Sequence, residues 1–495
     1  MSTPSVLNYS MDSFDVGDYV VFERSYTPFD FIIFSKLSGD TNLLHHDVEY
    51  ASRSVFGKPI VPLHITLSPL SMIAGTVFPG EPSLYLSHEV RAARPVFYDE
   101  VLRYSARVEA VNASHRVLSL RVLALRGTEV VLDATMRVQS QALIWSTPPA
   151  LPIRKGAQPS LAVITGGTGE IGSAIALVLA SQGWRLIIQD RGNDKRRSEL
   201  QARLSRIQAD TTFVSADLAS EAGRNTLASA IASADDLGLI VHAASPRVTA
   251  SADLLVAVNF SALKKMVDAS LPKMLARQKA AIVLIGTSAT EYALAGWEAY
   301  AGAKSMATNL VDGLDRRYAA YGVRGLTLMP GLVSTRFSSD YRGDAQTLLP
   351  QEVAEAVVQM VDEHVEGNVV ILEPGRYRRG RRGFLENVSV TAVASFGSSI
   401  SPVHSISTSE GDAARATMSP VARVLSKALR LPDNTDLSNA GLGLTPGWDS
   451  LKHIELLLEI EAALGISFAT AEIEKMHDFS RLDALCRKKI AERSV

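Results

Sequence analysis

The sequence predicts a multidomain chain in which an α+β domain, an α/β domain with a doubly wound parallel sheet and a small all-α bundle follow one another. Its 495 residues are too many for a single hydrophobic core, so about two to four domains are expected. Two changes in composition divide the chain: residues 144–159 contain a cluster of prolines, and residues 384–417 are rich in Ser, Ala, Thr and Gly. We therefore expect domains at 1–143, 160–383 and 418–495, joined by a semi-rigid linker and then a flexible one.

The overall composition is that of an ordinary water-soluble protein. The chain has 46% hydrophobic residues, 21% charged residues and a net charge of -2, so nothing global indicates nucleic-acid binding. A single cysteine, Cys486, excludes an internal disulfide and a cysteine-built metal site and fits a reducing compartment. The N-terminus lacks a signal-peptide pattern, and no apolar run reaches the roughly 18 residues of a membrane span. We expect a cytoplasmic protein with no metal and no membrane partner.

The first domain combines helical and strand-like periodicity. Residues 31–37 have helical spacing, and a second apolar helix is predicted around 65–74. From residue 84 onward the sequence alternates, and 101–108, 117–125 and 129–138 are predicted strands of an antiparallel sheet. A long helix wrapped by such a sheet is a hot-dog architecture.

Several motifs of this domain carry a family resemblance. The sequences Ser-Gly-Asp-Thr-Asn-Leu-Leu-His at 38–45, Phe-Gly-Lys-Pro-Ile-Val at 56–61, Phe-Pro-Gly at 78–80 and Pro-Val at 95–96 resemble the MaoC-like (R)-specific enoyl hydratases. The resemblance implies that Asp40 and His45 are the catalytic pair and that Asn42 supports them. A carboxylate and an imidazole suit the movement of an α-proton and of water beside a thioester carbonyl near neutral pH.

One segment departs from the family pattern. Where the family usually has His-Gly after Ile-Val, this chain has Pro62-Leu63. Because that segment lines the thioester pocket, the departure leaves chain-length preference, activity and the direction of the hydration step open. The alternative is a hot-dog domain that only binds or dimerises.

The second domain begins with a phosphate-binding pattern. A short apolar strand at 161–164 runs into Thr-Gly-Gly-Thr-Gly-Glu-Ile-Gly at 165–172 and then a predicted helix at 173–181. Strand, glycine turn and helix in this order are the context of a dinucleotide fingerprint, with the pyrophosphate at the helix N-terminus. The next strand, 185–189, ends at Asp190-Arg191; an acid there favours NAD and an arginine favours NADP, so the choice stays open.

A tyrosine and a lysine then follow on one helix face. Tyr300 and Lys304 stand at i and i+4. An ammonium close to a phenol lowers a tyrosine pKa that is otherwise about 10 and prepares the phenol for proton transfer to a carbonyl oxygen.

Together these motifs are similar to the short-chain dehydrogenase/reductase family, of the 3-ketoacyl reductase type, over about 160–375. The resemblance implies that Tyr300 is the acid, that Lys304 positions the nicotinamide ribose and that Asn259 supports a proton relay. Residue type favours Ser288 as the hydroxyl that polarises the carbonyl, whereas the usual spacing selects Thr287. The expected cofactor is NADPH, with NADH as the alternative. The expected cofactor-binding residues are Thr165, Gly166, Gly169, Ile171, Gly172, Asp190, Arg191, Asp217, Pro330, Gly331 and Thr335.

Two positions depart from that family. Glu170 stands where the commonest fingerprint has its middle glycine, although Gly169 serves in variant forms. His-Ala-Ala-Ser at 242–245 replaces the usual Asn-Asn-Ala-Gly beside the cofactor. Further on, a run of arginines at 376–382 follows the last predicted strand, 369–372. We expect this run to be solvated, with docking of an acidic carrier or a phosphate as the alternative.

The third domain is predicted to be a four-helix bundle. Helix candidates lie at 421–429, 451–464 and 482–490, with a short one at 472–476. Asp449-Ser450-Leu451, just before the second of them, resembles the attachment site of acyl carrier proteins. By that resemblance Ser450 carries 4′-phosphopantetheine, added by a phosphopantetheinyl transferase. The alternative is an ordinary helix N-cap.

The resemblances of all three domains imply the same substrate type, an acyl thioester. We expect a 3-ketoacyl group on the arm of Ser450 to be reduced at Tyr300 and then dehydrated at Asp40 and His45. A separate condensing enzyme would supply the substrate, and a homodimer is expected by analogy with both catalytic families. One alternative is a reductase and hydratase acting on free acyl-CoA. The other is a carrier scaffold with partly inactive catalytic domains.

Overall fold

A computed structural model describes residues 9–81, 83–156, 160–291, 295–339, 346–362, 367–381 and 384–388. Toward the C-terminus it describes residues 419, 421–422, 425, 437, 460, 464 and 478–493. The chain forms two compact units, Met1–Phe396 and Gly397–Val495.

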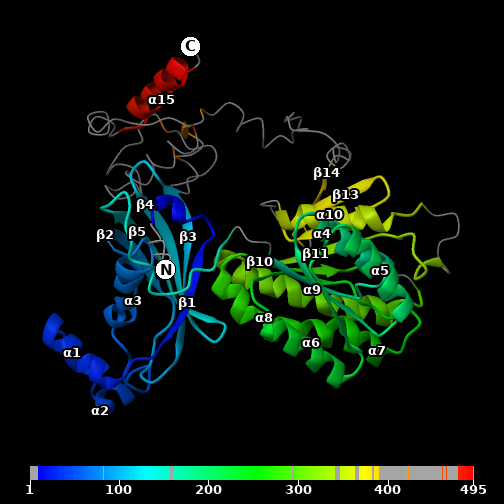
Figure 1. Ribbon diagram of the computed structural model, residues 1–495, viewed down its shortest axis with the longest axis horizontal. Coiled ribbons are helices and arrows are strands. Elements are labelled where there is room, and N and C mark those ends of the chain that lie inside the picture. Colours follow the sequence, from blue (N-terminus) through cyan, green and yellow to red (C-terminus); the bar gives the residue numbers. More distant parts are fainter. Residues whose placement is uncertain are drawn as a thin grey trace, which may run out of the picture. The chain divides into compact units, whose positions relative to one another are not determined.

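The N-terminal domain is a five-stranded antiparallel sheet with a helix against one face (Figure 1), which confirms the predicted α+β class. The strand order is β1-β3-β4-β5-β2. The strands are β1 (Tyr19–Arg24), β2 (Ser83–Ala92), β3 (Leu102–Asn112), β4 (Val117–Arg126) and β5 (Glu129–Ser140). Helix α3 (Leu63–Thr76) buries Ile65, Leu70 and Ile73 in a core shared with alternate residues of these strands.

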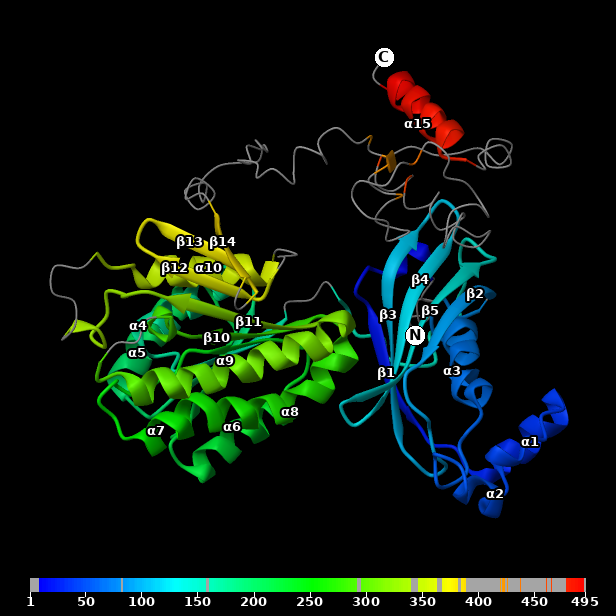
Figure 2. The same cartoon turned by 180° about the vertical axis from the view of Figure 1, so that it is seen from behind.

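A second helical segment of this domain is packed quite differently. Helix α1 (Pro28–Ser38) and the short α2 (Val48–Ser52) lie beyond the end of the sheet, whereas α3 covers its face (Figure 2). Of the α1 residues only Phe31 is buried, while Phe29, Ile32, Ile33 and Leu37 are exposed, Leu37 by 86%. The helix ends at Gly39, whose positive φ of 77° turns the chain toward Asp40.

The central domain is a nine-stranded sheet of the predicted doubly wound type. Its strand order is β14-β13-β12-β11-β10-β9-β6-β7-β8, and all strands from β6 to β12 pair in parallel. The parallel strands are β6 (Leu161–Thr165), β7 (Arg185–Asp190), β8 (Thr211–Ser215), β9 (Leu237–His242), β10 (Ala280–Ile285), β11 (Val323–Pro330) and β12 (Val369–Glu373). Their near-continuous apolar runs reflect a sheet buried on both faces.

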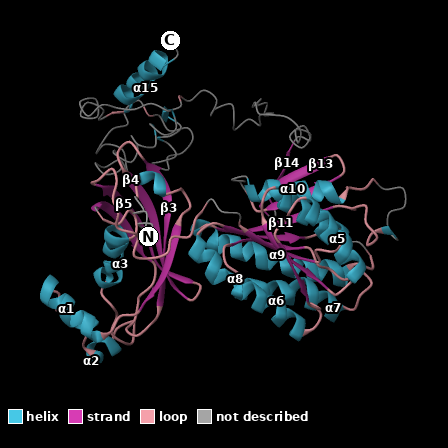
Figure 3. Ribbon diagram, viewed as in Figure 1, coloured by secondary structure: helices cyan, strands magenta, loops and turns pink. Residues whose placement is uncertain are grey.

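Helices cover both faces of this sheet (Figure 3). One face packs against α4 (Glu170–Ser181), α5 (Asp194–Arg206) and α10 (Pro350–Asp362). The other packs against α6 (Glu221–Ser233), α8 (Ala262–Arg277) and α9 (Glu298–Tyr318). The short helix α7 (Ala252–Val256) precedes α8 and contributes Leu255 to a small core beside Tyr300.

The arginine run lies largely on a strand, which the sequence analysis did not predict. Residues Arg376–Arg381 are β13, paired antiparallel with β12 on one side and with β14 (Phe384–Val388) on the other. Alternation along β13 buries Tyr377 and leaves Arg376 exposed. The segment 384–388, predicted as the start of the flexible linker, thus belongs to the sheet.

The predicted carrier domain is only partly covered. Helix α15 (Phe479–Arg493) includes the predicted helix at 482–490, and it buries Leu482 and Cys486. Ser450 and the predicted helix at 472–476 lie outside the described residues, as do most of 421–429 and 451–464.

Among the helices of the described residues, none has the length and apolar character needed to cross a membrane.

Candidate active sites

The glycine turn after β6 forms the floor of a cavity in the central domain. Gly166 has a φ of 61°, and a Cβ there would lie 2.8 Å from the Cα of Ala244. A Cβ on Gly172 would lie 2.4 Å from the carbonyl oxygen of Gly166. Only glycine fits these two positions, so the turn brings bare backbone and the N-terminus of α4 to the cavity wall, which suits a pyrophosphate.

The cavity has a volume of about 670 Å³, which is in the size range of cofactor and ligand sites. Ten of the predicted cofactor residues line it: Gly166, Gly169, Ile171, Gly172, Asp190, Arg191, Asp217, Pro330, Gly331 and Thr335. Thr165 does not line it. The Thr165 side chain is buried behind the turn, where its hydroxyl donates to Nδ1 of His242 at 2.8 Å.

Tyr300 and Lys304 project from α9 into the same cavity, as their spacing predicts. Lys304 Nζ donates to the carbonyl oxygen of Ile285 at 2.8 Å, and burial lowers the pKa of this ammonium to about 7. Burial raises the pKa of Tyr300 to about 12, against the opposite effect of the Ser245 and Thr287 hydroxyls. The lowered pKa that the sequence predicted for this phenol is not found, because desolvation is the largest effect on it.

The structure brings Thr287, and not Ser288, to the tyrosine. Thr287 lines the cavity and interacts with Tyr300, whereas Ser288 begins a buried 3₁₀ turn, Ser288–Thr290, and does not line the cavity. The preference for Ser288, which rested on residue type, is corrected by this placement. The usual family spacing selects Thr287, in agreement with this placement.

Asn259 lies in a π-helical turn, Ala257–Ser261, directly before α8. Its Nδ2 donates to the carbonyl oxygen of Leu255 at 2.9 Å, and its buried Oδ1 has no partner among the described residues. Such an acceptor is available to a water or a bound molecule.

His242 is the first residue of the His-Ala-Ala-Ser segment that departs from the family pattern, and its ring has a structural role. Its Nε2 donates to the carbonyl oxygen of Val258 at 3.1 Å, and burial lowers the pKa of this imidazole to about 3, so the ring is neutral. The ring therefore links the end of β9 both to Thr165 on β6 and to the turn that carries Asn259.

Asp190, which lines the cavity, forms an ion pair with an arginine that the sequence analysis did not identify. Arg197 of α5 binds both carboxylate oxygens of Asp190 at 2.8 Å, and the backbone N–H of Gly192 donates to Oδ1 at 2.6 Å. The Asp190 side chain is fully buried, while Arg191 and Arg196 line the cavity. The basic cluster Lys-Arg-Arg at 195–197 was the available sequence signal.

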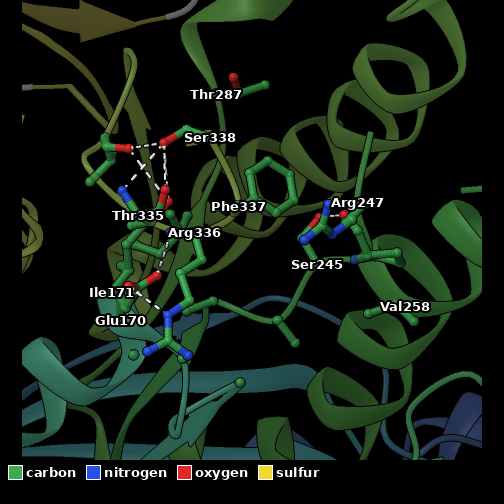
Figure 4. A pocket seen from close by; sticks show the side chains of 18 of the residues that line it. Glu170, Ile171, Ser245, Arg247, Val258, Thr287, Thr335, Arg336, Phe337 and Ser338 are labelled. Carbon is green, nitrogen blue, oxygen red and sulfur yellow. Dashed lines mark hydrogen bonds and ion pairs between the residues drawn. The ribbon is translucent and has the colours of Figure 1, made fainter. Parts of the chain in front are cut away.

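Side chains of the segment after β11 close another wall of the cavity (Figure 4). The Ser338 hydroxyl is buried and accepts from the backbone N–H of Thr335 at 3.3 Å. Phe337 packs against Tyr300 with ring centroids 6.0 Å apart, and Trp297 meets the same ring edge-on at 5.7 Å. The tyrosine therefore sits in an aromatic pocket.

The second predicted site lies at the end of α1. His45 Nε2 is 3.8 Å from Asp40 Oδ2, so the predicted pair is brought together without a direct hydrogen bond. His45 Nδ1 donates to the carbonyl oxygen of Ile60 at 2.8 Å, which leaves Nε2 facing Asp40. Asn42 caps the short turn Leu43–His45 by accepting from the N–H of Leu44 at 3.1 Å, and its own N–H donates to Asp40 at 3.0 Å.

The side chains of this pair are partly exposed. The side chain of Asp40 is 33% exposed and that of His45 is 13% exposed. Pro62 and Leu63, which replace the usual His-Gly, form the N-cap and first residue of α3. In the described part of the chain, no group of three or more His, Cys, Asp or Glu residues is arranged to hold a metal ion.

Two family matches cover these two regions. Residues 160–346 match the family described as short chain dehydrogenase, and residues 16–124 match the MaoC like domain. The central domain is therefore similar to short-chain dehydrogenases, and the N-terminal domain is similar to MaoC-like domains.

Similar proteins cover the central domain. An uncharacterized oxidoreductase of Staphylococcus aureus (strain MW2) is 25% identical over 227 residues, which are 43% of this chain and 96% of the relative. A short-chain dehydrogenase from Sphingobium yanoikuyae, solved in complex with NADPH, is 20% identical with a TM-score of 0.39 and covers 43% of this chain and 87% of its own. A 3-oxoacyl (acyl-carrier-protein) reductase from Agrobacterium tumefaciens C58, solved with NADP bound, is 24% identical with a TM-score of 0.41. The match covers 44% of this chain and 93% of the reductase chain.

Proposed function

We propose that this chain reduces the 3-keto group of an acyl thioester with NADPH and removes water from the resulting 3-hydroxyacyl thioester. The observation that carries the proposal is the presence of two sites with consecutive chemistry on one chain. Tyr300, Lys304 and Thr287 meet in a dinucleotide-sized cavity, and Asp40 and His45 meet in the MaoC-like domain. The product of the first reaction is the substrate of the second.

In the reduction, bound NADPH would supply the hydride. The Tyr300 phenol would give its proton to the carbonyl oxygen, and the high pKa of this phenol keeps it protonated at neutral pH. The Thr287 hydroxyl would donate to the same oxygen as negative charge develops. Lys304 and the unpartnered Oδ1 of Asn259 would hold water through which the phenol recovers its proton.

The adenosine end of the cavity supports NADPH over NADH. To recognise NAD, Asp190 would have to accept a hydrogen bond from the ribose 2′-hydroxyl. Both of its oxygens are already bound by Arg197 and its side chain is fully buried. Arg191 and Arg196 line the cavity there and would bind a 2′-phosphate.

In the dehydration, the α-proton and the 3-hydroxyl group leave together as water while the C=C bond forms. One member of the Asp40–His45 pair would take the α-proton and the other would protonate the leaving hydroxyl. The gap of 3.8 Å between them keeps the two groups apart, so that both are available to the substrate.

The open surface beside this pair supports a homodimer. Phe29, Ile32, Ile33 and Leu37 expose apolar side chains on α1, directly before Asp40. An acyl chain bound at Asp40 needs apolar walls, and a contiguous apolar surface of this kind is typical of an interface. A second copy of the chain would cover α1 and complete the thioester pocket.

The carrier function rests on sequence alone. Ser450 would bear 4′-phosphopantetheine, attached by a phosphopantetheinyl transferase, and a separate condensing enzyme would supply the 3-ketoacyl group. The arm would present the thioester to both sites without release.

The test uses the full chain, modified with phosphopantetheine and loaded with a 3-ketoacyl group. On addition of NADPH, intact-mass spectrometry should show a gain of two hydrogens followed by loss of water. If neither change appears, the proposed function is wrong. Ser450→Ala should abolish only the tethered reaction; undiminished activity with free acyl-CoA as the preferred substrate would favour that alternative. If a Tyr300→Phe, Asp40→Asn double variant still supports formation of the same final acyl product, the alternative of a carrier scaffold with partly inactive catalytic domains would be favoured.

A further inference from the structure

Glu170 presents an electrostatic problem in the cofactor cavity. It is the first residue of α4, and it lines the cavity together with Gly169 and Ile171. The positive end of the helix dipole attracts its carboxylate, but it would attract the cofactor pyrophosphate to the same place. Two anions at one helix end repel each other, so binding of the pyrophosphate requires a compensating cation.

The structure places an arginine at this position. The backbone N–H of Arg336 donates to Glu170 Oε2 at 2.8 Å, and Arg336 Nε lies 4.0 Å from Oε1 (Figure 4). Arg336 also lines the cavity. It belongs to the segment after β11, which is fixed next to it by the buried hydroxyl of Ser338. Glu170 therefore fastens this segment to the glycine turn.

The two contacts between Glu170 and Arg336 differ in strength. The backbone hydrogen bond is short and charge-assisted, so it holds the main chain in place. The contact between the charged groups is too long for a hydrogen bond, and the Arg336 side chain is 75% exposed. Exposed ion pairs of this kind contribute little to stability, so the guanidinium can exchange one anion for another at small cost.

We propose that Arg336 binds the pyrophosphate of the dinucleotide cofactor and that Glu170 is the positioning residue that holds Arg336 at the cavity. On cofactor binding the guanidinium passes from the Glu170 carboxylate to the pyrophosphate, while the backbone hydrogen bond to Glu170 stays. This inference rests on the proposed nicotinamide cofactor. By this inference Glu170, which stands in place of the middle fingerprint glycine, has the role of positioning Arg336.

The first experiment measures the dissociation constants of NADPH and NADH by titration calorimetry on the full chain. Arg336→Ala should weaken both by about tenfold and by equal factors, because both carry the pyrophosphate. Arg196→Ala should weaken NADPH alone, because it acts on the 2′-phosphate. Arg203→Ala on α5 is the matched control on a residue that does not line the cavity.

The second experiment separates the two roles of Glu170. Glu170→Gln keeps an oxygen for the N–H of Arg336 and removes the negative charge, so both cofactors should bind about threefold more tightly. Glu170→Ala releases the segment and should weaken both. Thermal unfolding without cofactor checks that the variants are folded.

The outcomes separate this inference from the proposed function. If the unaltered protein binds neither dinucleotide, the proposed reductase fails. If it binds NADPH but Arg336→Ala changes neither constant, or Glu170→Gln weakens binding as much as Glu170→Ala, the inference is overturned and the reductase stands.

Discussion

The two candidate active sites differ in how deeply their side chains are buried. Tyr300 and Lys304 are buried in a cavity whose walls come from several elements of the central domain, and burial moves both pKa values. Asp40 and His45 are fixed by local hydrogen bonds but face an open surface beside the exposed helix α1. The first site is thus enclosed by its own domain, whereas the second lies partly exposed at the surface of its domain.

Tyr300→Phe should produce the largest difference between the activities of the two sites. Loss of the phenolic proton donor should reduce NADPH-dependent reduction by about 10²–10⁴-fold. Hydration of an enoyl thioester, followed by the loss of its ultraviolet absorbance, should be unchanged. A parallel loss of both activities would contradict the independence of the two sites.

The reciprocal variant is Asp40→Asn. Removing one of the two proton-transfer groups should lower dehydration by about 10²–10³-fold, again because general acid–base catalysis is lost. The rate of NADPH oxidation with a 3-ketoacyl thioester and the dissociation constant of NADPH should both stay the same. Normal dehydration by this variant would exclude the proposed pair.

Thr287→Ala and Ser288→Ala test the hydroxyl that the structure selects. Loss of a donor to the developing oxyanion should lower kcat of the reduction by about 10²-fold for Thr287→Ala. Ser288→Ala should change it less than about twofold, because that side chain lies away from the cavity. The opposite ranking would return the role to Ser288.

Burial of Lys304 has a consequence for stability that depends on pH. Its pKa falls from 10.5 to about 7 in the fold, so between these values the unfolded chain binds more protons and stability rises with pH. Lys304→Met should raise the free energy of unfolding by on the order of 4 kcal/mol at pH 7, and the gain should shrink toward pH 10.

Urea unfolding of the cofactor-free protein at pH 7, 8 and 9 measures this effect. Lys265→Met, an exposed lysine on α8, is the matched control. A gain that stays constant with pH would mean that packing, and not the charge, accounts for it.

The smallest expected effect concerns the open site. Leu37→Asp places a charge on the exposed apolar face of α1. If α1 forms the proposed dimer interface, this charge should dissociate the proposed dimer and lower dehydration by about tenfold, because a charge buried in an interface without a partner lowers affinity. Sedimentation velocity measures the mass, with Ile207→Asp on the central domain as control. A dimer that survives with full dehydratase activity would refute the proposed role of α1.

Features set by local sequence were predictable. The glycine turn at 165–172 and the i, i+4 spacing of Tyr300 and Lys304 depend on neighbouring residues, and the structure places them in one cavity. Strand β13 was not predicted because most of its residues are arginines. Only Tyr377 marks the alternation of apolar and polar residues that is typical of a strand. The pair Asp190–Arg197 joins residues only seven positions apart, and the basic cluster at 195–197 was its sequence signal. The pair Glu170–Arg336 joins residues 166 positions apart, so only the tertiary structure reveals it.

The pKa of Tyr300 was mispredicted for a related reason. Sequence shows which charges are near in the chain, but it does not show how completely a side chain is removed from water. For the choice between Thr287 and Ser288, the family spacing indicated the residue that lines the cavity, whereas residue type did not.

The hairpin of β13 and β14 has a practical consequence for anyone who divides this protein into fragments. β12 is an apolar strand, and the hairpin supplies the hydrogen-bonding partner along its outer side. A recombinant central domain ending near residue 375 would leave that row of backbone groups unpaired, which is the geometry that promotes aggregation. A soluble fragment should therefore extend through residue 388, so that the arginine-bearing strand remains in place.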